Sequence, residues 1–213
     1  MDIETPSLII INGTQGSGKS WLIKYMMYKL RKKFSYGLVF TNTFFDNKPF
    51  KYIPDLFVHP EYDEEKLIAL MDLQAKLVEQ GNIKEAFVIF DDCMDDPGQF
   101  KSLALKRLTT QCRHYHITVI FSTQYCNHLP ARMRTNAMEI IIFSTDAKVA
   151  LEALYNSYGQ KFENYNDFKK YVMENTGNHK FIYYKKKSEE KDLNKLYQVM
   201  KAPAKIPNFK IEY

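Results

Sequence analysis

The sequence lacks any hydrophobic run long enough to cross a membrane. No stretch of its 213 residues approaches the roughly 18 apolar residues that a membrane-spanning helix needs. The first four residues, Met1-Asp2-Ile3-Glu4, also lack the charged and then apolar pattern of a signal peptide. We therefore expect a soluble, intracellular protein with no integral membrane segment.

Cysteine and arginine are scarce. The three cysteines, Cys93, Cys112 and Cys126, have no paired metal-ligand spacing and each lies beside an apolar segment, which predicts small core thiols in a reducing compartment. Only five arginines occur, and four of them fall between residues 107 and 134. Because lysine carries most of the positive charge, this cluster suggests a specific role in contacting phosphate.

The excess of positive charge is confined to the end of the chain. The net charge is +5, and residues 179–213 hold nine lysines against four acidic residues, so the rest is balanced. We predict one P-loop ATPase domain over residues 1–185 and a basic tail over residues 186–213. The tail either contacts nucleic acid or is solvated and partly disordered.

A complete phosphate-binding loop is present near the start of the chain. Gly13-Thr14-Gln15-Gly16-Ser17-Gly18-Lys19-Ser20 follows the apolar run at 8–11 and precedes a helical pattern from Trp21. The backbone N–H groups of such a loop surround phosphate oxygens, and the following helix directs its positive end at them. Lys19 is placed to reach the β- and γ-phosphates, and the Ser20 hydroxyl to bind Mg²⁺.

Strand and helix patterns alternate along the chain. Strands are expected at 8–12, 37–41, 86–90, 118–122 and 139–143, with a further edge strand at 181–184; helices are expected at 19–33, 63–79, 98–113, 147–158 and 165–175. This alternation predicts an α/β fold with a doubly wound, mostly parallel sheet and helices on both faces. Ligands of such sheets bind at the carboxyl ends of the strands.

Two of these strand ends carry chemistry. Asp91-Asp92 ends the strand at 86–90, with Asp91 placed on the Mg²⁺ side and Asp92 placed to orient and deprotonate an attacking water; helix capping is the alternative. If the strand at 118–122 lies between the first strand and this acidic strand, Gln124 becomes a sensor of the γ-phosphate. Otherwise Gln124 is a polar residue that opens a loop.

The run from Cys112 to Gln124, followed by 129–136 with its Leu-Pro-x-x-x-Arg pattern, resembles the HerA–FtsK family of DNA-pumping ATPases. Within that family the chain is most similar to the genome-packaging ATPases of poxvirus-like and related large-capsid DNA viruses and virophages. The resemblance covers residues 8–143. It implies an ASCE-type, RecA-like P-loop NTPase, and with the five parallel strands counted in chain order we expect the order 5-1-4-3-2.

The resemblance also implies how the site works. It implies ATP and Mg²⁺ as cofactors and a homo-oligomeric ring, hexamer or pentamer, that hydrolyses ATP between subunits and translocates double-stranded DNA. Gly13, Gly18, Lys19 and Ser20 match the phosphate loop, Asp91 the Mg²⁺-side carboxylate, Asp92 the catalytic acid and Gln124 the sensor. Arg113 matches the arginine finger, with Arg134 as a second candidate; a charge that complements the helix dipole is the alternative for Arg113.

The expected partners are double-stranded DNA and a viral capsid or procapsid protein. The expected location is the infected host cell, in the cytoplasm or a viral factory, or the virion. A P-loop nucleoside monophosphate kinase is an alternative, although no arginine-rich lid follows the strand at 118–122. A virion-assembly or export ATPase of the filamentous-phage type is another, and the missing membrane span argues against it. A non-enzymatic nucleotide switch would not use Asp91, Asp92 and Gln124 together.

Overall fold

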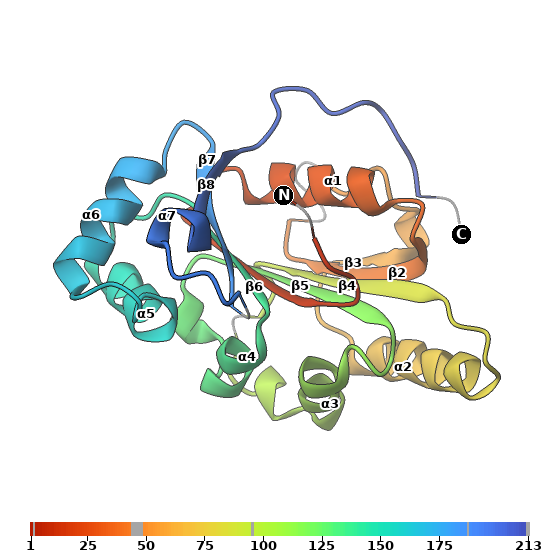
Figure 1. Ribbon diagram of the computed structural model, residues 1–213. Helices are drawn as coiled ribbons and strands as arrows, with labels where there is room; N and C mark the ends of the chain where they lie inside the picture. Colours follow the sequence, from red (N-terminus) through yellow and green to blue (C-terminus); the bar gives the residue numbers. More distant parts are fainter. Residues whose placement is uncertain (2, 44–48, 95, 187, 212–213) are drawn as a thin grey trace.

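The computed structural model describes residues 1, 3–43, 49–94, 96–186 and 188–211, which form one eight-stranded sheet with helices on both faces (Figure 1). The strands are β1 (Leu8–Asn12), β2 (Phe34–Thr41), β3 (Val58–His59), β4 (Glu85–Asp91), β5 (Ile117–Thr123), β6 (Glu139–Ile142), β7 (Lys180–Lys185) and β8 (Tyr197–Lys201). The α-helices are α1 (Lys19–Leu30), α2 (Glu64–Glu79), α3 (Leu103–Gln111), α4 (Ala131–Asn136), α5 (Lys148–Tyr158), α6 (Tyr165–Asn175) and α7 (Leu193–Leu196). Three short 3-10 helices lie at Asp55–Phe57, Gln99–Lys101 and Cys126–His128.

The central strands are buried on both faces, which explains why their sequences are mostly apolar. Successive side chains of a strand point to opposite faces, so Leu8 and Ile10 pack in one core layer and Ile9 and Ile11 in the other. The layer on the α1 side is covered by α1, and the opposite layer by α2 to α7. Such double coverage is the usual setting of parallel strands.

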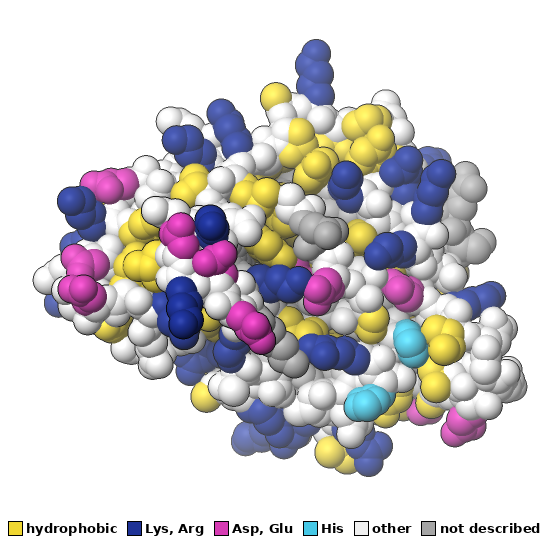
Figure 2. Space-filling view, viewed as in Figure 1, with side chains coloured by type: hydrophobic (Ala, Val, Ile, Leu, Met, Phe, Trp, Pro, Cys, Tyr) yellow, Lys and Arg dark blue, Asp and Glu magenta, His cyan; other side chains and the backbone are white. Residues whose placement is uncertain are grey.

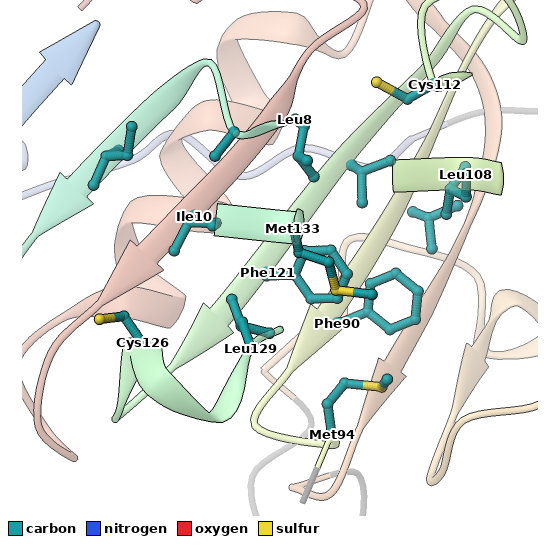
Figure 3. Packing of buried hydrophobic residues seen from close by; sticks show 14 of the residues in the cluster. Leu8, Ile10, Phe90, Met94, Leu108, Cys112, Phe121, Cys126, Leu129 and Met133 are labelled. Atoms are coloured by element: carbon teal, nitrogen blue, oxygen red, sulfur yellow. The ribbon is translucent and has the colours of Figure 1, made fainter. Parts of the chain in front are cut away.

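Aromatic stacking joins β4 and β5 in the core layer that α2 to α7 cover. The rings of Phe90 and Phe121 are nearly parallel, with centroids 4.6 Å apart, and both are buried. Figure 3 shows Met133 of α4 lying against this pair, with Leu129 and Ile10 close by. This packing fixes the position of the residues that follow, Asp91 in β4 and Ser122 in β5, relative to each other.

The strand order confirms the predicted core and extends it. The sheet runs β3-β2-β4-β5-β1-β6-β7-β8, so the five predicted parallel strands occupy its middle in the predicted order. It differs in detail because β3 adds an edge beside β2, and β7 and β8 continue antiparallel from β6. The strand predicted at 181–184 exists, but it is not an edge strand, because β8 pairs with its outer side.

The segment predicted as a basic tail contributes to the sheet through β8. After β8 the chain crosses α1 (Figure 1), where Trp21 Nε1 donates a hydrogen bond to Pro203 O at 2.8 Å. Phe209 then packs against the rings of Tyr28 and Tyr52. Ile211 is buried, and its backbone N–H donates to Tyr52 O. The described part of the last residues is therefore packed onto the domain.

One predicted helix starts later than expected. Residues 98–102 form a 3-10 turn and an extended cap, and α3 begins at Leu103. Ser102 Oγ accepts a hydrogen bond from Leu105 N at 3.0 Å, so Ser102 is the N-cap.

Across the described residues, no helix is both long and apolar enough to span a bilayer.

Gly37 of β2 gives a test of the packing between β2 and β4. A Cβ at Gly37 would lie 2.5 Å from the backbone oxygen of Phe87, an atom that cannot move without shifting β4. We expect Gly37→Ala to lower the free energy of unfolding by about 1–3 kcal/mol in urea titrations. Gly98→Ala is the control, because its new methyl group meets only the movable carboxylate of Asp96; equal stability of the two variants would contradict this packing.

Candidate functional site

The carboxyl ends of β1, β4 and β5 meet at one edge of the sheet. Asn12, the last residue of β1, is in register with Thr123 of β5, and Asp91 of β4 is in register with Ser122. β5 thus lies between the strand that leads into the phosphate-binding loop and the acidic strand, as the sequence predicted. The Asn12 side chain joins the two ends, since its Nδ2 donates to Gln124 O at 3.1 Å.

The loop at 13–20 is built as a phosphate-binding loop between β1 and α1. Gly13 must be glycine, because a Cβ there would lie 2.5 Å from Cβ of Phe143, and Gly18 has a φ of 111°. Gly13 N donates to Thr123 O, and both the backbone N–H and the Oγ1 of Thr14 donate to Ser144 O at 3.2 Å. The loop is therefore anchored to the strands on both sides of β1.

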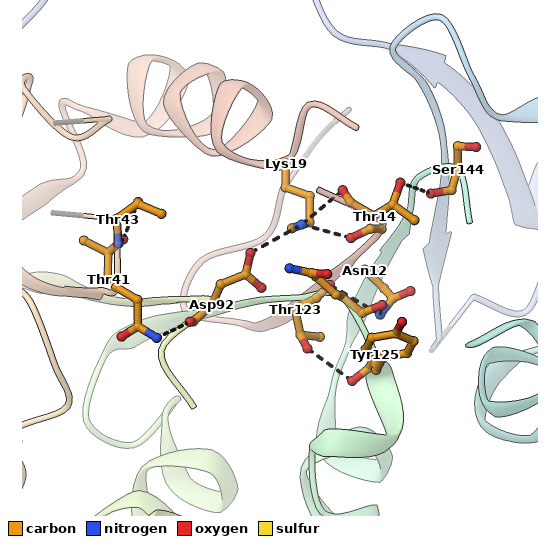
Figure 4. Close-up of polar contacts among 12 residues, drawn as sticks. Asn12, Thr14, Lys19, Thr41, Thr43, Asp92, Thr123, Tyr125 and Ser144 are labelled. Carbon is orange, nitrogen blue, oxygen red and sulfur yellow. Dashed lines mark hydrogen bonds and ion pairs between the residues drawn. The ribbon is translucent and has the colours of Figure 1, made fainter. Parts of the chain in front are cut away.

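Lys19 links the loop to the acidic strand. Its side chain is 5% exposed, and Nζ donates to Gly13 O at 2.9 Å and to Thr14 O at 3.3 Å. The same ammonium forms an ion pair with Asp92 Oδ2 at 3.5 Å (Figure 4). A lysine between the loop and a carboxylate is placed where negative charge on a terminal phosphate would be neutralised.

Asp91 is a buried carboxylate in need of a partner. It is 3% exposed, and burial raises its pKa above the usual range, with a further upward contribution from the charge of Asp92. Asp91 Oδ1, Ser122 Oγ and Asn12 Oδ1 are all buried and make no hydrogen bond of good geometry among the described residues, although the hydroxyls of Ser122 and Ser20 lie close enough to Asp91 to offset part of the rise in its pKa. Three such oxygens near the loop suit a hard cation that prefers oxygen ligands.

These donors fit Mg²⁺ bound together with a nucleotide. No group of three or more His, Cys, Asp or Glu side chains with metal-site geometry occurs in the described part of the chain. Mg²⁺ does not need such a group, because it commonly takes one or two protein oxygens and completes its shell with phosphate oxygens and water. Asp91 and Ser20 remain the predicted Mg²⁺ ligands, and their chemistry fits that role.

Asp92 is held in a defined but uncommon backbone conformation. Its φ is +46°, in the left-handed region that few residues other than glycine adopt. Asp92 N donates to Ser122 O at 3.1 Å, and Asn42 Nδ2 donates to Asp92 O at 2.8 Å. These contacts turn the carboxylate out of the strand and toward Lys19, which is what a group that orients water beside the phosphate requires.

Gln124 follows β5 and borders the same space. It lines a cavity of about 200 Å³ with Asp92, Thr123 and His128. Because β5 is adjacent to both β1 and β4, the start of this loop lies between the phosphate-binding loop and Asp92. The structure thus brings Lys19, Asp91, Asp92 and Gln124 together at one edge.

The two predicted arginines lie elsewhere. Arg113 precedes β5, at the amino edge of the sheet, where its guanidinium contacts Met138 Sδ and lies near Glu4. β5 has seven residues, so at about 3.3 Å per residue Arg113 is roughly 20 Å from the loop of its own chain. Arg134 of α4 donates from Nη1 to Ser157 Oγ of α5 at 2.7 Å.

The sequence analysis missed several residues that shape the site. Asn12, Asn42 and Ser144 each contact the loop, β5 or Asp92 from a neighbouring segment. All three come directly after the apolar run of a parallel strand. Because ligands bind at the carboxyl ends of such strands, a polar residue at each of these ends could have been predicted to lie near the site.

The buried position of Asp91 predicts a trade between stability and metal binding. Because its folded pKa is raised, wild-type stability should fall as pH rises above the unfolded pKa of this carboxyl. We expect Asp91→Asn to unfold at neutral pH with a free energy about 1–3 kcal/mol higher than wild type, with no difference at low pH. The same variant should lose Mg²⁺-dependent ATP binding, measured by calorimetry with and without EDTA.

Asp72→Asn on the exposed face of α2 is the matched control and should change neither property. A pH-independent difference between Asp91→Asn and wild type would show that the charge of Asp91 does not oppose folding.

Proteins of similar sequence come from viruses. Protein 075L of Invertebrate iridescent virus 6 is 32% identical over 181 residues, which are 83% of this chain and 69% of that protein. Protein L437 of Acanthamoeba polyphaga mimivirus is 28% identical over 186 residues, covering 82% of this chain and 65% of L437. The chain therefore spans about two thirds of the length of these relatives.

A solved structure with the same fold is the genome packaging NTPase B204 from Sulfolobus turreted icosahedral virus 2, determined in complex with ATP-gammaS. It superposes with a TM-score of 0.66 at 21% identity, covering 88% of this chain and 96% of B204. This likeness confirms the predicted P-loop NTPase fold. The family described as Poxvirus A32 protein matches residues 3–164, and the chain belongs to that family.

Proposed function

We propose that the chain is the ATPase of a viral genome-packaging motor, which hydrolyses ATP and translocates double-stranded DNA. The observation that carries the proposal is the contact of Lys19 with both the phosphate-binding loop and Asp92, beside the buried Asp91. Membership of the Poxvirus A32 family and the fold shared with a genome packaging NTPase support it.

The residues at the sheet edge divide the hydrolysis between them. The loop N–H groups and Lys19 hold the phosphates, and Asp92 orients water for attack on the terminal phosphorus and takes its proton. Asp91 and Ser20 would hold Mg²⁺, which when bound would supply further positive charge at the phosphates. Gln124 lies beside Asp92 along the cavity and senses whether the terminal phosphate is present.

The chain supplies only part of this site. Arg113 contacts Met138 at the opposite edge of the sheet from the ion pair of Lys19 and Asp92. In a closed ring, one subunit's amino edge can face its neighbour's carboxyl edge, so Arg113 is placed to serve the next site. Arg134 is the second candidate, although its bond to Ser157 ties it to α5.

A basic cavity suits the phosphates of DNA. It has a volume of about 660 Å³ and is lined by Arg31, Lys32, Lys84 and Lys210, and none of the described residues that line it is acidic. The upper right of Figure 2, over the end of α1 and the last described residues, shows basic side chains gathered without acidic ones. Contacts of this kind neutralise backbone phosphates without reading sequence.

The partners and location follow from the viral relatives. All of the relatives named above belong to viruses, so the chain is proposed to be virus-encoded and to act in the infected cell, in the cytoplasm, a viral factory or the virion. A capsid or procapsid protein is the proposed docking partner of the ring. A hexamer or pentamer satisfies the need for a neighbouring arginine.

Mixing experiments test the shared site. We expect Arg113→Ala and Lys19→Ala each to lower DNA-stimulated ATP turnover by at least 10³-fold, because one lacks the finger and the other the phosphate-binding lysine. Mixed subunits should regain part of the turnover, since a Lys19→Ala neighbour still supplies Arg113. Turnover is measured by phosphate release with and without double-stranded DNA.

Lys76→Ala, on the exposed side of α2, is the control and should keep full turnover. Absence of rescue in the mixture would contradict the shared site. Turnover that requires a nucleoside monophosphate and ignores DNA would replace the motor with a kinase.

A further inference from the structure

We propose that His179 and Trp21 form the surface that binds the nucleoside end of ATP, which makes His179 a positioning residue supplied by the turn before β7. This proposal rests on the ATPase function proposed above. It assigns a role to a segment far from the phosphate-binding motif in sequence, because residues 177–179 lie about 160 positions after Gly18.

The antiparallel direction of β7 brings His179 to the site. β7 pairs with β6 with Ile142 opposite Ile182, so the start of β7 lies at the carboxyl edge of the parallel strands. His179 comes directly before β7 and faces the amino end of α1. A Cβ on Gly18 would lie 3.4 Å from Nδ1 of His179, so the imidazole is in contact range of the phosphate-binding loop.

The sheet order decides which end of the nucleotide meets His179. Asp91, Asp92 and Gln124 lie on the β4 and β5 side of β1, where the terminal phosphate is hydrolysed. β6 and β7 lie on the other side of β1. A triphosphate held by the loop with its terminal phosphate at Asp92 therefore directs its nucleoside toward β7.

Trp21 provides an exposed aromatic surface on the same side. It is 40% exposed, which is unusual for the largest side chain, and it belongs to the first turn of α1. Its Nε1 donates to Pro203 O, while the neighbouring Ala202 N donates to His179 O. The same short segment after β8 thus fixes both Trp21 and the backbone of His179, and a fixed ring face can stack on a base.

The turn before β7 is tight and fixes the position of His179. Gly177, Asn178 and His179 have φ values of +102°, +49° and +62° in succession. A hydrogen bond from Lys180 N to Gly177 O at 2.8 Å closes the turn, and positive φ at its two central residues, Asn178 and His179, is what a type I′ turn requires. The turn therefore holds the His179 side chain beside Gly18.

Two glycine variants separate the effect of removing the His179 side chain from the effect of placing glycine at a position with positive φ. His179→Gly and Asn178→Gly both relieve a left-handed residue and should both resist urea at least as well as wild type. Only His179→Gly should weaken binding of a non-hydrolysable ATP analogue with Mg²⁺, by about 10-fold in calorimetry, with KM raised and kcat nearly unchanged. Neither variant should change the affinity for inorganic tripolyphosphate, which has no nucleoside.

Trp21 is the only tryptophan in the sequence, so it reports directly on this surface. The ATP analogue should quench its fluorescence, and tripolyphosphate should not. Unchanged ATP affinity in His179→Gly, or an equal loss for tripolyphosphate, would overturn the proposal. If the wild-type protein binds neither ligand, the ATPase function itself fails, and that result is distinct from both.

Discussion

The position of β5 between β1 and β4 is the constraint on which the whole site depends. It places the end of the acidic strand one strand away from the phosphate-binding loop, close enough for Lys19 Nζ to lie 3.5 Å from Asp92 Oδ2. The stacked rings of Phe90 and Phe121 fix the two strands below this point. The catalytic geometry is therefore set by core packing and needs few contacts of its own.

The same edge concentrates polar groups that oppose folding. Asp91 is buried with a raised pKa, and three buried oxygens there make no hydrogen bond of good geometry among the described residues. A core strand normally avoids such groups because desolvation is costly. A ligand that supplies positive charge would account for their presence at the ends of β1, β4 and β5, and the mostly apolar strands below support the cost.

The acidic pair and the predicted arginine finger lie at opposite edges of the sheet. The carboxylates and the loop occupy the carboxyl edge, while Arg113 and the basic cavity around Arg31 and Lys84 are built from segments at the amino ends of strands. A monomer cannot bring these edges together, because the length of the sheet separates them. In the proposed ring, neighbouring copies would bring the amino edge of one subunit next to the carboxyl edge of another.

The sequence by itself determined the local features. It gave the apolar strands, β1 with its observed bounds, the glycine loop and the acidic pair, because each depends on residues adjacent in the chain. The polar end of β5, Thr123-Gln124, also indicated the central strand order, because it suits a strand between β1 and β4. Only the tertiary structure decided that β8 and the segment crossing α1 complete the domain, that the Asn12 side chain reaches Gln124, that Asn42 contacts Asp92 and that His179 lies beside Gly18. Those contacts join residues up to 182 positions apart, and no local pattern records which distant segments the sheet brings together.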